Sequence, residues 1–104
     1  GRLTRDENMA DIAGLELART AVVTAQPAGG IEADKAFYRG WAQVWAQQVT
    51  TDEAQRRSLQ DVRAPGVWRS NGPIMQQDAF GGAFGCKAGT PMQPKPADRV
   101  SLFP

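Results

Sequence analysis

The sequence predicts an all-α fold, a small bundle of about four helices with a long ordered loop and an extended, proline-rich tail. Apolar and helix-forming residues recur at helical spacing through the first 60 residues, and no segment longer than a few residues alternates in the manner of a strand. With 104 residues, of which 41% are hydrophobic, the chain suffices for one compact domain with a modest core.

The first helix is expected from Thr4 to about Gln26. Thr4 and Glu7 have the spacing of a capping box, in which the threonine hydroxyl accepts from the third helical amide and the glutamate reaches back. Alanines and leucines, which favour helix, fill the segment. Breakers in the segment 27–30 end it.

The second helix is expected from Glu32 to Val49. Its apolar face would pack in the core and consists of Phe37, Trp41, Val44, Trp45 and Gln48, with Tyr38 beside it. A short third helix should cover Asp52 to Leu59, with a second capping-box pair in Thr50 and Glu53.

The next segment, from Gln60 to Pro73, reads as a loop because it is interrupted by Pro65, Gly66, Gly72 and Pro73. A fourth helix is expected from Gln77 to Phe84, where Phe80 and Phe84 form a pair one turn apart. The tail from Gly85 carries four prolines and should be extended.

Composition excludes several functions. Twelve basic and eleven acidic residues are scattered along the chain, with a net charge of +1, which argues against nucleic acid or a membrane surface as the main partner. No apolar run approaches the roughly 20 residues that a membrane span needs. Histidine is absent and Cys86 is the single cysteine, so the chain alone offers no Ser-His-Asp triad, no disulfide and no complete zinc site.

One face of the first helix carries two acids. Glu7 and Asp11 are four residues apart and project from the same side, and the small residues Gly14 and Ala18 follow. Such a face suits a partner helix that carries a cation. The abrupt start at Gly1 suggests a piece of a longer chain, which could supply that partner.

The opening segment resembles the G-x-x-T-x-x-E-N-x-A-D-x-x-G-L motif of neprilysin-like zinc metallopeptidases, which include endothelin-converting enzymes and bacterial secreted endopeptidases. The resemblance implies that Glu7 is the third zinc ligand beside two histidines of an upstream HExxH helix. It also implies that Asp11 orients one of those histidines, and a zinc-bound histidine commonly donates to such a carboxylate. On the residues alone, Glu7 could be only a capping residue and Asp11 a solvated acid.

Two further segments resemble the same family. Ala42-Gln43-Val44-Trp45-Ala46 matches A-Q-x-W-C, with Ala46 in place of a cysteine, so the disulfide of animal members is absent and a bacterial relative is indicated. The segment 61–72 resembles D-x-H-S-P-x-x-x-R-V-N-G. There Arg63 replaces the histidine that stabilises the oxyanion, and Arg69 matches the substrate-binding arginine. Arg63 could also be a loop residue paired with Asp61, and Arg69 a salt-bridge partner within the loop.

The last match, residues 80–94, resembles F-x-x-A-F-x-C-x-x-G-x-x-M-x-P and implies a structural role, in which Pro91-Met92-x-Pro94 pins the tail. Family members often end in C-x-V-W, which Asp98-Arg99-Val100-Ser101 replaces here.

The resemblance therefore implies the C-terminal part of a gluzincin catalytic domain over residues 1–104, from a zinc-dependent endopeptidase outside the cytoplasm. Its partners would be peptide substrates and the upstream HExxH part, whose zinc activates water for attack on the scissile carbonyl. Alone, the chain should be inactive and bind zinc weakly. A non-catalytic helical interaction module is the alternative, favoured by Arg63. Without its partner, the chain could also self-associate through bared apolar surface.

Overall fold

The computed structural model describes residues 4–46, 50–60 and 66–102. Within these ranges it contains five α-helices, a short 3₁₀-helix and no strand, only an isolated bridge between Thr90 and Gln93. The all-α prediction is confirmed. No helix in the described ranges has the length and apolar composition that a bilayer crossing requires.

Helix α1 spans Arg5–Ala25 and is the longest element, as predicted. Its N-terminal cap differs from the prediction: Thr4 makes no capping hydrogen bond, and its hydroxyl accepts from the Asn8 side-chain amide at 3.2 Å. A side chain one turn on therefore competes with the backbone amides for the threonine oxygen. The capping-box reading of Thr4 and Glu7 is wrong, so capping does not account for Glu7.

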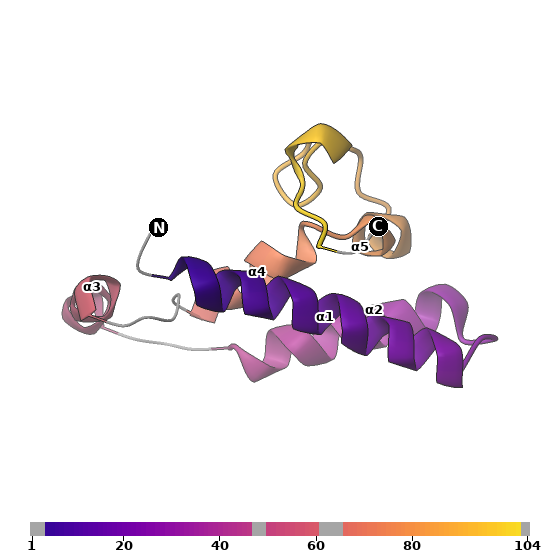
Figure 1. Cartoon of the computed structure of the whole chain (residues 1–104), viewed down its shortest axis with the longest axis horizontal. Coiled ribbons are helices and arrows are strands. Elements are labelled where there is room, and N and C mark those ends of the chain that lie inside the picture. The colour runs from indigo at the N-terminus through magenta and orange to yellow at the C-terminus, as the bar shows by residue number, and fades with distance from the viewer. Residues whose placement is uncertain (1–3, 47–49, 61–65, 103–104) are drawn as a thin grey trace.

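Helix α2 spans Gly30–Val44 and runs alongside α1 (Figure 1). Arg19 on α1 joins Asp34 on α2 through two hydrogen bonds of 3.0 and 3.1 Å. The predicted extension to Val49 is wrong at Trp45, which caps the helix: its amide donates to the Ala42 carbonyl at 3.2 Å, and the Ala46 amide donates to the Gln43 carbonyl at 3.4 Å. Gln48 and Val49 lie outside the described residues.

The buried face of α2 is offset from the predicted stripe. Tyr38 is 1% exposed and forms the centre of the core with Leu15 and Ile74, whereas Val44 is 69% exposed. Phe37 and Trp41 pack against this centre as expected. The core therefore lies where α1, α2 and the later helices meet.

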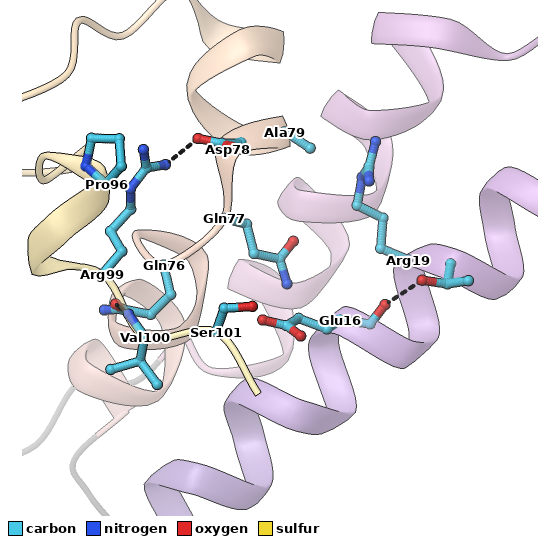
Figure 2. Close-up of a pocket in the computed structure, with 11 residues that line it drawn as sticks. Glu16, Arg19, Gln76, Gln77, Asp78, Ala79, Pro96, Arg99, Val100 and Ser101 are labelled. Carbon is cyan, nitrogen blue, oxygen red and sulfur yellow. Dashed lines mark hydrogen bonds and ion pairs between the residues drawn. The ribbon is translucent and has the colours of Figure 1, made fainter. Parts of the chain in front are cut away.

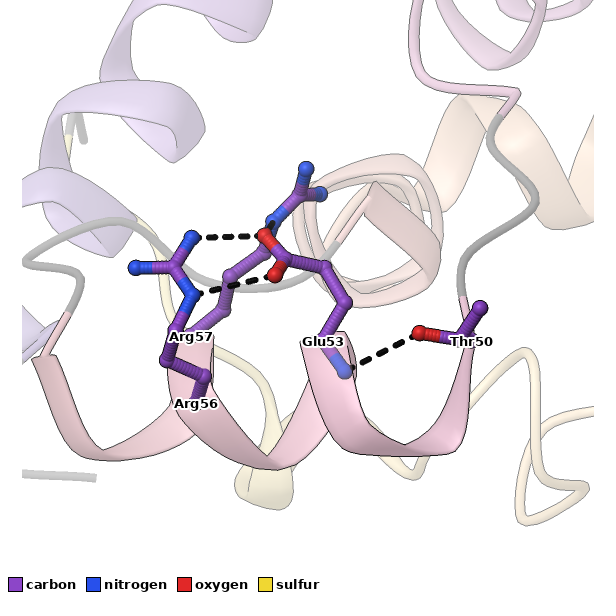
Figure 3. A network of polar contacts seen from close by, with 4 residues as sticks. All are labelled: Thr50, Glu53, Arg56 and Arg57. Carbon is purple, nitrogen blue, oxygen red and sulfur yellow. Dashed lines mark hydrogen bonds and ion pairs between the residues drawn. The ribbon is translucent and has the colours of Figure 1, made fainter.

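Helix α3 spans Thr51–Gln60 and stands apart at one end of the molecule (Figure 1). Here the capping prediction is confirmed for Thr50, whose hydroxyl accepts from the Glu53 amide at 3.1 Å. The Glu53 carboxylate turns instead toward Arg56 and Arg57, and these guanidinium groups lower its pKa to about 2 (Figure 3). Local interactions therefore hold this helix.

Helix α4 spans Gly66–Ile74, so the loop predicted from Gln60 to Pro73 is wrong over that range. Gly66 opens the helix, but Pro73 lies inside its last turn, where a proline is disfavoured because it has no backbone N–H to donate. Pro73 cannot bond the Arg69 carbonyl four residues back, and the Trp41 indole N–H donates to that oxygen at 2.9 Å instead. Ile74, at the end of α4, packs in the core, and this packing also stabilises the helix.

Helix α5 spans Asp78–Phe84 and matches the prediction closely. Gly85 ends it with φ of 70°, a left-handed conformation that glycine adopts without strain. The predicted aromatic pair is confirmed, with the Phe80 and Phe84 rings 5.1 Å apart.

The tail is not simply extended. Its prolines permit turns, and a 3₁₀-helix forms over Pro96–Asp98. Arg99 then pairs with Asp78, and the Val100 amide donates to Gln76 at 2.8 Å, so the tail folds back onto the junction of α4 and α5. Met92 packs against the core, which confirms the predicted anchoring role of its segment.

Candidate active site

The two acids of α1 lie as the helical spacing predicts, with Glu7 one turn before Asp11. Glu7 is half-buried, and its carboxylate has no hydrogen bond or ion pair with any residue in the described ranges. A carboxylate in this state is available to a ligand that approaches from outside the chain.

Asp11 has an internal partner that the sequence did not indicate. Its two oxygens accept from Nε and Nη2 of Arg69, each at 2.8 Å. Both side chains are largely buried, with 11% of Asp11 and 15% of Arg69 exposed. Two parallel bonds of this kind are a strong and geometrically specific form of ion pair. Asp11 is therefore held rigidly and is not a solvated helix acid.

Arg69 lies on α4 rather than in the expected loop, and its salt bridge crosses to α1 rather than staying within the segment 61–72. The structure thus brings together two residues assigned separately to the site. They are 58 residues apart in the sequence, and the packing of α4 against α1 joins them.

Trp45 completes this cluster. Its ring lies under the guanidinium of Arg69, with 3.7 Å between the ring centroid and Cζ, a cation–π contact. The Trp45 indole nitrogen is buried and has no hydrogen-bond partner among the described residues. Sequence reasoning placed Trp45 in the core only. Its spacing of four residues from Trp41 indicated a shared face but not the arginine on it.

The predicted docking face beyond the acids is open. Gly14 and Ala18 are both exposed, and a Cβ added at Gly14 would meet no atom within 4 Å. Another helix could therefore approach α1 closely here. Arg63, the remaining residue assigned to catalysis, lies outside the described residues.

The residues present fit a zinc ion only as part of a shared site. The described ranges contain no group of three or more His, Cys, Asp or Glu side chains that could hold a metal. A protein zinc site needs three or four such ligands. Glu7 offers one carboxylate, while Asp11 is engaged with Arg69, so the remaining ligands would have to come from other residues.

Comparison with known proteins addresses the family directly. The model of "Peptidase family M13" matches residues 1–100. The chain belongs to peptidase family M13. Among curated relatives, the M13 chain is 34% identical to Neprilysin-1 of Caenorhabditis elegans over 90% of its own length. It is 29% identical to endothelin-converting enzyme 1 of Rattus norvegicus over 91%.

A third relative, membrane metallo-endopeptidase-like 1 of Homo sapiens, is 31% identical over 93% of the M13 chain. The chain spans only 14% of the length of each of these three relatives. No solved structure matches it. The resemblance to neprilysin-like peptidases drawn from the sequence motifs is confirmed.

Proposed function

We propose that this M13 chain is the C-terminal part of a zinc-dependent endopeptidase, in which Glu7 is the third zinc ligand. The other two ligands would be the histidines of an HExxH helix from outside this sequence. The observation that carries the proposal is the Glu7 carboxylate, which has no partner in the described ranges and lies one turn from the rigidly held Asp11. Gly14 and Ala18 leave the adjacent face open to the incoming helix.

Asp11 would act as a positioning residue. A carboxylate has about four lone-pair sites, and Arg69 occupies two of them. The others can accept the N–H of a zinc-bound histidine and so fix its ring orientation. Because Arg69 already fixes Asp11, the histidine would meet an acceptor that is in place.

Arg69 would also contact the peptide substrate. Its planar guanidinium, paired with Asp11, has the fork geometry that suits hydrogen bonding to a carbonyl or carboxylate of the substrate. Arg63 would donate to the oxyanion that develops at the scissile carbonyl, in place of the usual histidine. A misplaced donor to the oxyanion lowers the rate by about 10²–10³-fold, so the rate of hydrolysis would depend on where the Arg63 guanidinium lies.

Zinc, when bound, lowers the pKa of water and polarises the scissile carbonyl. This chain holds no histidine, so we expect it to be inactive alone and to bind zinc weakly. We place the complete peptidase outside the cytoplasm, as the resemblance to secreted members of the family implies. We assign it to a bacterium because Ala46 stands where animal members form a disulfide.

The test is zinc content and peptide hydrolysis in the complete peptidase that carries this chain. Glu7→Gln should weaken zinc binding by about 100-fold or more, because loss of a direct ligand should cost at least as much as loss of a supporting residue. Asp6→Asn is the matched control, since Asp6 neighbours Glu7 but is fully exposed. Unchanged zinc content in the Glu7 variant would falsify the proposal, as would tight 1:1 zinc binding by the isolated chain in equilibrium dialysis.

A further inference from the structure

A cavity of about 350 Å³ lies away from the acidic face of α1. It is open to solvent and is lined by the middle of α1, the junction between α4 and α5, and the C-terminal tail (Figure 2). Glu16, which lines it from α1, is nine residues after Glu7, and at 100° per residue this places it on the opposite side of the helix. The cavity is thus independent of the proposed zinc site.

Gln77 supplies a buried donor to this cavity. The residue is only 7% exposed, and its amide oxygen accepts from the Tyr38 hydroxyl. Its amide nitrogen is buried and has no hydrogen-bond partner among residues 4–46, 50–60 and 66–102. Figure 2 shows the amide pointing from the junction toward α1. Burial of an amide N–H without an acceptor is costly, so a group that accepts from it would be favoured.

Glu16 supplies an acceptor on the facing wall. Its carboxylate reaches from α1 into the cavity (Figure 2), and no hydrogen bond or ion pair joins it to the described part of the chain. The other charged groups on the walls are engaged: Arg19 with Asp34, and Arg99 with Asp78. One donor and one acceptor therefore face the same space.

We propose that this cavity binds a peptide group from a polypeptide segment. The carbonyl oxygen would accept from the Gln77 amide nitrogen, and the peptide N–H would donate to the Glu16 carboxylate. An anion would be repelled by Glu16, and an ammonium or guanidinium cation could not accept from Gln77. The volume lies at the lower end of the roughly 300–1,000 Å³ typical of ligand sites, which suits two or three residues.

The test uses the full chain and two small probes followed by NMR. N-methylacetamide offers a carbonyl and an N–H, whereas methyl acetate keeps the carbonyl and has an ester oxygen in place of the N–H. The amide should bind about tenfold more tightly or better, because it adds a hydrogen bond to a charged acceptor. Binding should also shift the side-chain amide resonances of Gln77.

Glu16→Ala should abolish the preference for the amide probe without unfolding the chain, since Glu16 is only half-buried. Glu32→Ala is the matched control, because Glu32 is an exposed helical glutamate on α2 that does not line the cavity. Equal affinity of the two probes for the unaltered chain would overturn the proposal. Absence of binding, or a preference that survives Glu16→Ala, would overturn it equally.

Discussion

At the scale of single residues, the ion pair between Asp11 and Arg69 decides the geometry of the candidate active site. Each bond is 2.8 Å long and both side chains are largely shielded from water. Trp45 covers the guanidinium and restricts it further. A carboxylate that is fixed in this way can orient a neighbouring ligand without first losing side-chain entropy.

We predict that Asp11→Ala lowers the free energy of unfolding by about 3 kcal/mol, because it leaves a mostly buried arginine without its counter-charge. The measurement is chemical denaturation followed by circular dichroism. Asp6→Ala removes the fully exposed carboxylate that faces Arg5 at 4.0 Å and should leave the free energy of unfolding nearly unchanged. If the two variants were equally stable, the ion pair would not hold α1 against α4.

At the scale of elements, α4 shows how a tertiary contact permits a helix that local signals oppose. Gly72 and Pro73 both disfavour helix, and Pro73 leaves the Arg69 carbonyl without its usual donor. The Trp41 indole supplies a donor from α2, at 2.9 Å from the Arg69 oxygen and 3.2 Å from the Ser70 oxygen. Helix α2 thus stabilises the end of α4 through one side chain.

We predict that Trp41→Phe destabilises the chain by about 1–3 kcal/mol through loss of this hydrogen bond. Pro73→Ala restores a backbone N–H that can bond the Arg69 carbonyl, so it should recover part of the loss in the Trp41→Phe background. Denaturation of both single variants and the double variant gives the coupling between them. Strictly additive effects would contradict the compensation between the proline and the indole.

At the scale of the whole molecule, the five helices leave much apolar surface uncovered. Leu17 on α1 is 58% exposed, and Val67 and Trp68 on α4 are each 62% exposed. Large exposed apolar side chains mark interaction surfaces when they gather on a small protein. In the complete peptidase we expect other parts of the protein to cover them.

We predict that the isolated chain therefore self-associates as its concentration rises. Sedimentation velocity should show oligomers that Trp68→Ser reduces, because this change removes the largest of these exposed side chains. Leu59→Ser is the control, since Leu59 is 79% exposed but lies on α3, which stands apart from the other helices. A single monomeric species over the whole concentration range would contradict the prediction.

The sequence alone determined the all-α class, three of the four predicted helices to within a few residues, the early part of α2, and the M13 family. Helical periodicity and local capping depend on neighbours within a few residues, and Glu7 and Asp11 share a face for the same reason. The roles of Glu7, Asp11, Arg63 and Arg69 stay predictions.

Only the tertiary structure decided that residues 66–74 form a helix, that the tail turns back, and that Asp11 meets Arg69. These features depend on groups far apart in the sequence: an indole on α2 that bonds an α4 carbonyl, and a guanidinium on α4 that reaches a carboxylate on α1. A prediction from local propensity assigns a segment with helix breakers to a loop, because it takes no account of a hydrogen-bond donor that another helix supplies.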